Sequence, residues 1–156
     1  MAANVDYYEP RTQHGSSLSP SVYGIVGAWI GHDDISYDYF IRSCAVDLFN
    51  TNKAVSGGTF IGGIHTAACG VAWQIVTAGF LGMDVDGSQL SFAPRLPAGW
   101  QRVSFYLEIR GAGIDVDVSR HVVHCTSRSD SAATITISVA GVGEDLQPDA
   151  AVSLTF

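Results

Sequence analysis

The pattern of apolar positions along the chain changes character near Gly82. Before this residue, apolar side chains recur three and four residues apart, which is the spacing of one helix face. After it, they alternate with polar side chains, which is typical of half-buried strands. The sequence therefore predicts a helical segment over residues 1–82, followed by a strand-rich domain over residues 83–156.

Two of the three predicted helices have recognisable ends. The first begins at Ser19 and Pro20, with the serine as N-cap and the proline at the first helical position. Gly31 can end it in a left-handed conformation. The second helix opens at Asp33 and Asp34, whose carboxylates suit the positive end of the helix dipole. The residues expected to form its buried stripe are Ile41, Cys44, Ala45 and Leu48.

The third predicted helix runs from about Thr66 to Phe80 and is apolar on nearly all sides. It lies in a stretch without Asp, Glu, Lys or Arg between Lys53 and Asp84, which is long enough to span a bilayer. The first half of that stretch is a polar, glycine-rich loop, so a helix buried within a soluble protein is favoured. Such a helix needs neighbours on several sides, and we expect some of them to lie outside this chain.

Six segments after Gly82 are predicted to be strands. They are residues 89–92, 102–110, 114–119, 122–126, 134–139 and 152–156. Turn-forming residues separate the alternating runs, as between antiparallel neighbours. The expected fold class is α + β in two parts, with helices first and an antiparallel, jelly-roll-like β-sandwich after them.

Composition narrows the classes of partner. Hydrophobic residues make up 47% of the 156, enough for a core. The formal net charge is −7 and Lys53 is the single lysine, so nucleic acid and anionic membrane surfaces are not expected partners. Three cysteines without C-x-x-C spacing argue against a disulfide framework or a zinc site. With no signal peptide in the sequence, they indicate reduced thiols and a cytoplasmic location.

Two loops, residues 12–20 and 56–66, each lead into a predicted helix N-terminus. Such an end carries unpaired N–H groups and about half a positive charge, which makes it a natural seat for phosphate. We expect the two ends to converge on one anion. The candidate phosphate-binding residues are His14, Ser16, Ser17, His65 and Thr66. From the residues alone, a capping turn and a structural histidine remain open as alternatives.

Four sequence blocks resemble glycoside hydrolase family 65, which includes maltose, kojibiose, nigerose and trehalose phosphorylases and acid trehalases. Residues 7–19 match its Y-Y-x-P-x-T-x-H-x-S-S-L-S segment, and residues 63–73 match its G-x-H-x-x-x-x-G-x-x-W stretch. Residues 79–83 resemble its G-F-G-G-M turn, and residues 90–97 its L-x-F-x-P-x-L-P strand. The blocks occur in order over about two thirds of the chain.

The resemblance implies the last helices of an (α/α)6 barrel and the C-terminal β-sandwich that follows it. It also implies inverting phosphorolysis of an α-linked glucosyl disaccharide to β-glucose 1-phosphate, with inorganic phosphate as substrate and without a metal or organic cofactor. Inverting glycosidases keep their two reacting groups about 6.5–9.5 Å apart on opposite faces of the sugar. The family's general acid lies upstream of the first block, so no catalytic residue is expected here and the chain alone is expected to be inactive.

Two other functions stay open. A hydrolase of the same family would need a second carboxylate to activate water. Neither loop contains an acid, which favours phosphate, although Asp47 could still fill that role. Alternatively, the chain is a non-catalytic module that binds carbohydrate or anions, or an assembly piece that self-associates or needs a partner chain to complete the barrel.

Overall fold

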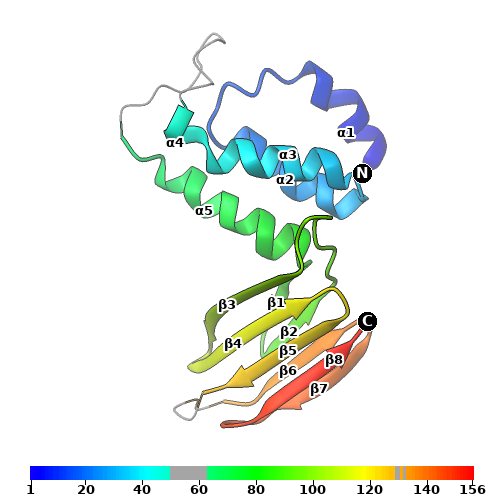
Figure 1. Cartoon of the computed structure of the whole chain (residues 1–156), viewed down its shortest axis with the longest axis vertical. Helices are drawn as coiled ribbons and strands as arrows, with labels where there is room; N and C mark the ends of the chain where they lie inside the picture. The colour runs from blue at the N-terminus through cyan, green and yellow to red at the C-terminus, as the bar shows by residue number, and fades with distance from the viewer. Residues whose placement is uncertain (50–62, 129–130, 132) are drawn as a thin grey trace. The chain divides into compact units, whose positions relative to one another are not determined.

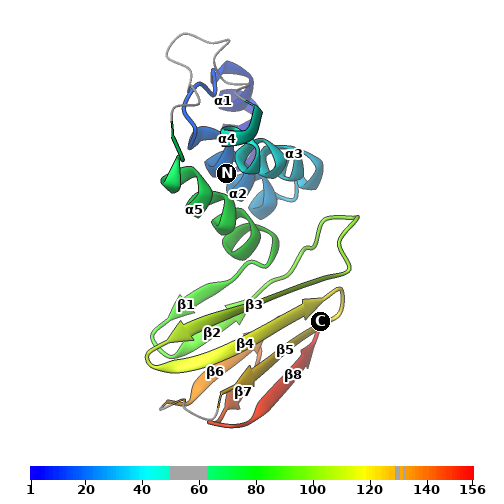
Figure 2. The same ribbon diagram turned by 60° about the vertical axis from the view of Figure 1, so that its left-hand side comes forward.

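The computed structural model describes residues 1–49, 63–128, 131 and 133–156. The chain divides into two compact units, Met1–Phe80 and Leu81–Phe156. Helices make up the first unit and strands the second (Figures 1 and 2). The predicted α + β organisation is confirmed.

Among the described residues of the helical unit, the three predicted helices are present together with further short helices that were not predicted. Its elements are α1 (Ala2–Tyr8), η1 (Glu9–Arg11), α2 (Ser19–Ile30), α3 (Asp33–Cys44), α4 (Val46–Phe49) and α5 (Thr66–Gln74), which continues as a π-helical segment, η3 (Ile75–Phe80). Gly31 ends α2 in the left-handed conformation, with φ of 78°. The predicted N-cap is wrong by one residue, because Leu18 is the N-cap and Ser19 lies inside the helix.

Small residues on α2 allow its two neighbours to approach closely. A Cβ on Gly24 would lie 2.9 Å from Ile75, and one on Gly79 would lie 3.4 Å from Ala28. The earlier residue of α2 contacts the earlier residue of η3, and the later residue contacts the later one, so α2 and α5–η3 run in the same direction. The Ser36 hydroxyl donates to the carbonyl of Gly24 over 2.6 Å, and Ser21 bonds Ser43. The earlier of these two α2 residues bonds the later of the two α3 residues, so α3 runs antiparallel to α2.

The predicted buried stripe of α3 is wrong. Ile41 and Leu48 are 47% and 69% exposed, Cys44 is exposed and Ala45 is half-buried. The buried residues of α3 are instead Ser36, Tyr39 and Ser43. The physical reason is the close approach to α2, since short hydroxyl side chains fit there and bond its polar groups whereas branched apolar ones do not.

Among its described residues, the strand-rich unit is built from two four-stranded sheets. One has the order β1 (Asp84–Asp86), β2 (Gln89–Phe92), β6 (Ile135–Val139) and β7 (Val142–Leu146). The other has the order β3 (Arg102–Ile109), β4 (Ala112–Ser119), β5 (Val122–Ser127) and β8 (Ala151–Thr155). All six predicted strands are present, and β1 and β7 are additional. Neighbouring strands are antiparallel except β2 and β6, which pair in parallel.

One apolar core lies within this unit and draws on both sheets. Leu90 and Ile137 of the first sheet and Ile114, Val118 and Val123 of the second are all fully buried. The alternation predicted from the sequence therefore places one face of each sheet in a shared core. Over the described parts of the chain, no helix combines the length and apolar character needed to cross a membrane.

Candidate functional site

The N-terminal ends of α2 and α5 point in the same direction (Figure 1). In the contacts Gly24–Ile75 and Ala28–Gly79, the two partners are 51 positions apart in the sequence. Because the helices are parallel, the same offset places Ser19 at the level of Gly70 along the helix axis. At 1.5 Å per residue, α5 begins about 6 Å beyond the start of α2. Because α3 is antiparallel, its C-terminal end lies at this same end of the unit. Convergence of the 14–17 loop with His65 and Thr66 on one anion stays a prediction.

His14 lies inside the helical unit, with only 9% of its surface exposed. Its Nδ1 lies 2.8 Å from the hydroxyl of Ser19, and its Nε2 lies 3.0 Å from the hydroxyl of Tyr39. The Tyr39 hydroxyl donates to Glu9 over 2.5 Å. The ring of Tyr23 packs edge-on against the imidazole at 4.8 Å. Nothing in the sequence marks Tyr39 as a partner of His14, because only the folded unit brings the two side chains together.

Burial shifts the titration of two of these groups. It lowers the pKa of His14, and the positive charge of Arg42 lowers it further against the opposing effect of Glu9. Burial also raises the pKa of Tyr39, and the hydrogen bond to Glu9 adds to that rise. Both shifts favour the neutral forms of the two side chains near neutral pH.

The lowered pKa of His14 makes stability depend on pH. Below its ordinary value of 6.5, the unfolded chain binds a proton at this residue that the folded chain takes up less readily. Stability is therefore lost as the pH falls from above 6.5 toward the folded-state pKa. We expect His14→Asn, which tolerates the same backbone conformation, to reduce the difference in urea stability between pH 7.5 and 5.5. His121→Asn should leave that difference unchanged, and an equal pH dependence in all three proteins would contradict the assignment.

Ser16 and Ser17 are more accessible than His14. Ser16 is exposed and Ser17 is half-buried. The Ser16 oxygen accepts the backbone N–H of Leu18 over 3.3 Å. This bond uses an oxygen lone pair and not the hydroxyl hydrogen, which can still be donated to a ligand. Donation from Ser16 and Ser17 to an anion stays a prediction.

Asp47 of α4 holds His65 just before α5. The backbone N–H of His65 donates to Oδ2 of Asp47 over 2.8 Å, and the ring Nδ1 pairs with Oδ1. The side-chain and backbone hydrogen bonds from His65 lower the pKa of Asp47, so this carboxylate is ionised at neutral pH. The second loop has no acid in its own sequence, but in the folded chain Asp47 reaches it from another helix.

Besides His65, the second loop was predicted to contribute Thr66 and a glycine-rich stretch, and the structure describes only part of these residues. Thr66 is exposed and is the first residue of α5. Its N–H bonds the carbonyl of Ile64 over 3.0 Å. Residues 56–62, with the glycine pair Gly57-Gly58, lie outside the described residues. Within the described segments, no cluster of His, Cys, Asp and Glu side chains is suited to a metal ion.

Comparison with known proteins decides the family. Residues 1–74 match the model of the glycosyl hydrolase family 65 central catalytic domain, and residues 83–142 match that of the family's C-terminal domain. The chain belongs to glycosyl hydrolase family 65. The resemblance drawn from the four sequence blocks is thereby confirmed.

Similar members of family 65 carry phosphorylase names. The chain is 46% identical over 138 residues to a 1,2-alpha-glucosylglycerol phosphorylase from Bacillus selenitireducens, covering 88% of this chain and 18% of that protein. It is 38% identical over 139 residues to a kojibiose phosphorylase from Caldanaerobacter subterraneus subsp. tengcongensis, covering 88% and 17%. A solved structure, titled a putative kojibiose phosphorylase from human microbiome, superposes with a TM-score of 0.78 at 27% identity, covering 99% of this chain and 22% of that one.

The family 65 chain thus spans less than a fifth of the length of these curated relatives.

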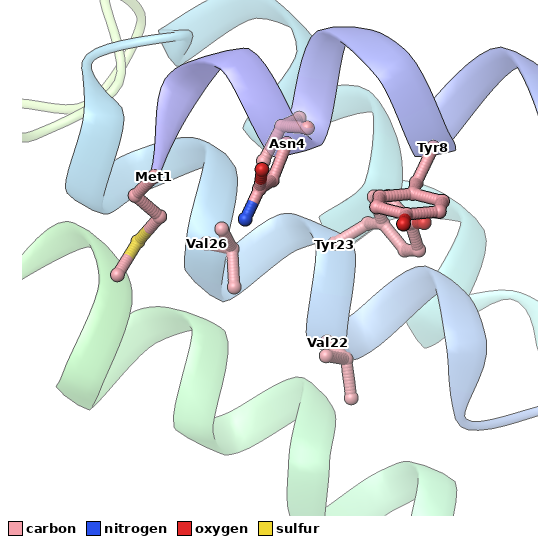
Figure 3. A pocket seen from close by; sticks show the side chains of 7 residues that line it. Met1, Asn4, Tyr8, Val22, Tyr23 and Val26 are labelled. Carbon is pink, nitrogen blue, oxygen red and sulfur yellow. The ribbon is translucent and has the colours of Figure 1, made fainter.

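The helical unit also has an apolar pocket of about 270 Å³ between α1 and α2. Figure 3 shows Asn4 of α1 pointing toward Val26 of α2, and Tyr8 lying beside Tyr23; Val22 also lines the pocket. Its lining has no charged side chain, so it does not suit phosphate.

Proposed function

We propose that this chain supplies the phosphate-side loops of a family 65 disaccharide phosphorylase. In the complete enzyme, phosphate would attack the anomeric carbon of an α-glucosyl disaccharide with inversion, giving β-glucose 1-phosphate. A general acid outside the region described here would protonate the leaving oxygen. The observation that carries the proposal is the common direction of α2 and α5, with hydroxyls at the first helix end and His65 at the second. The phosphorylase names of the similar relatives support it.

Asp47 determines how His65 can meet an anion. The Nδ1 hydrogen is directed at the ionised carboxylate, so His65 can donate to phosphate only through Nε2–H. A histidine that donates from both nitrogens is an imidazolium. Asp47 would offset that positive charge while phosphate is absent, and the imidazolium would separate Asp47 from bound phosphate. The two carboxylate oxygens are already engaged by His65, which favours phosphorolysis over a hydrolase in which Asp47 activates water.

Titration with inorganic phosphate tests the proposal. We expect saturable NMR shifts at Ser16, Ser17 and Thr66 and at the His65 imidazole, with a Kd on the order of 1 mM. His65→Ala removes a charge-assisted hydrogen bond worth about 1.5–3 kcal/mol, so it should weaken binding roughly tenfold or more. His121→Ala, in the strand-rich unit, is the control. Shifts confined to one of the two loops, or unchanged affinity in His65→Ala, would refute the proposal.

Exposed apolar side chains on the helical unit support an assembly role for the same chain. Ile41 of α3 and Trp73 of α5 are 47% and 48% exposed, and Leu48 of α4 is 69% exposed. We expect the isolated chain to self-associate, or to bind a chain carrying the remaining barrel helices. Either event would bury these exposed apolar side chains, and exposed apolar patches commonly mark interaction sites. Size-exclusion chromatography should show a concentration-dependent apparent mass that falls toward the monomer in Ile41→Lys. A monomer at all concentrations that binds no such chain would contradict this expectation.

A further inference from the structure

The hydrogen bonds around His14 assign each of its hydrogens. The Tyr39 hydroxyl has one hydrogen, and the 2.5 Å distance to Glu9 is typical of an O–H group donating to a carboxylate. That hydrogen is therefore used on Glu9. The Tyr39 oxygen can then only accept from Nε2 of His14, 3.0 Å away, so the imidazole carries its hydrogen on Nε2.

The role of the other ring nitrogen, Nδ1, follows from counting the hydrogens in the same way. A neutral imidazole has one N–H, so Nδ1 is an acceptor and the Ser19 hydroxyl donates to it over 2.8 Å. Both nitrogens of His14 are thereby engaged within the helical unit, and the residue is only 9% exposed. A neutral, buried imidazole with no remaining donor cannot contribute a charge-assisted bond to phosphate.

The backbone at His14 connects this arrangement to the serines. His14 has φ of 50°, a left-handed conformation that is uncommon for residues other than glycine. Such a conformation persists only where the surroundings enforce it. Ser19 of α2 and Tyr39 of α3 both hold the His14 ring in place. His14 lies two residues before Ser16 in the chain. The position of the imidazole therefore fixes where the chain turns into the serine-bearing part of the loop.

We propose that His14 is a positioning residue, held by Glu9, Tyr39 and Ser19 as a neutral imidazole with its hydrogen on Nε2, and that it orients Ser16 and Ser17 without touching the anion. The inference deepens the proposed phosphate site and rests on it for the role of the serines. The direct donors are then the two serines on the first loop and His65 at the second helix end. His14 differs from His65 because its partners leave no ring nitrogen available for a ligand.

The test is the ¹⁵N NMR signature of the His14 ring, recorded with and without inorganic phosphate. We expect the neutral Nε2–H tautomer at pH 7 and no direct phosphate effect on its ring nitrogens, while those of His65 shift. Tyr39→Phe removes the acceptor of Nε2–H and should give a mixture of tautomers, with phosphate affinity reduced about fivefold. Tyr37→Phe on the same helix is the control and should change neither.

An imidazolium or an Nδ1–H tautomer in the unmodified chain would overturn the inference. So would phosphate-induced shifts at the His14 ring nitrogens as large as those at His65, or an unchanged tautomer in Tyr39→Phe. If phosphate does not bind the unmodified chain at all, the proposed function fails, and the orienting role assigned to His14 fails with it. The tautomer measured without phosphate still decides the hydrogen-bond assignment by itself.

Discussion

Replacing Gly82 by alanine should destabilise the strand-rich unit by about 3 kcal/mol. Gly82 has φ of 52°, and a Cβ placed there would lie 2.8 Å from the carbonyl oxygen of Ala93. A left-handed conformation costs a non-glycine residue about 1–2 kcal/mol, and forcing an atom into occupied space adds about 1–3 kcal/mol. The contact is to backbone, next to the bond in which the Ala93 N–H donates to the carbonyl of Leu81 over 3.0 Å, so it cannot be relieved by a rotamer change.

Gly141 provides the matched control for this substitution. Its φ is 82°, but a Cβ there would meet no atom within 4 Å. Gly141→Ala should therefore cost only the conformational part, about 1–2 kcal/mol. Hydrogen exchange at the amides of β2 and β6 reports on this unit alone and would give both values. Equal losses in the two variants would show that the close approach to Ala93 has no energetic effect.

The elements that the sequence predicted well are those determined by local chemistry. Pro20 and Gly31 bracket α2 because proline fits the first turn of a helix and glycine fits the left-handed end. The strands followed from strict alternation, since a residue on one face of a sheet is buried and the next is not. β1 and β7 were missed because β1 is three residues long and exposed, and β7 is exposed in all but its last residue.

Features of the site that depend on distant segments could not be predicted. Spacing along α3 favoured Ile41 and Cys44 as the buried face, whereas the glycines of α2 select small hydroxyl side chains there. Asp47 reaches His65 from 18 positions earlier in the chain, and no motif in the sequence marks that pair. The candidate histidines and serines lie next to two predicted helix N-termini, and their binding of phosphate stays a prediction. The difference between the surroundings of His14 and His65 could not be predicted from the sequence, because it lies in partners such as Tyr39, which is 25 positions from His14.

Replacing Ser36 by valine should destabilise the helical unit by about 3 kcal/mol and also impair phosphate binding. Ser36 is completely buried, and its Cβ would lie 3.3 Å from a Cβ on Gly27. Valine loses the bond to the carbonyl of Gly24, worth about 1 kcal/mol, and adds methyl groups where space is absent, at about 1–3 kcal/mol. The added volume should push α3 away from α2. Since Tyr39 lies one turn after Ser36, its hydroxyl would move away from His14.

Ser36→Ala separates the two causes, because it removes the hydroxyl without adding volume and should cost about 1 kcal/mol. Urea unfolding followed by hydrogen exchange in α2 and α3 gives the stability of each variant, and phosphate titration gives the affinity. We expect the alanine variant to retain both the Nε2–H signature of His14 and the affinity for phosphate, and the valine variant to lose both. If Ser36→Val matched Ser36→Ala in stability, the α2–α3 interface would tolerate the extra methyl groups. Geometry at the anion site would then not depend on the close approach of these helices.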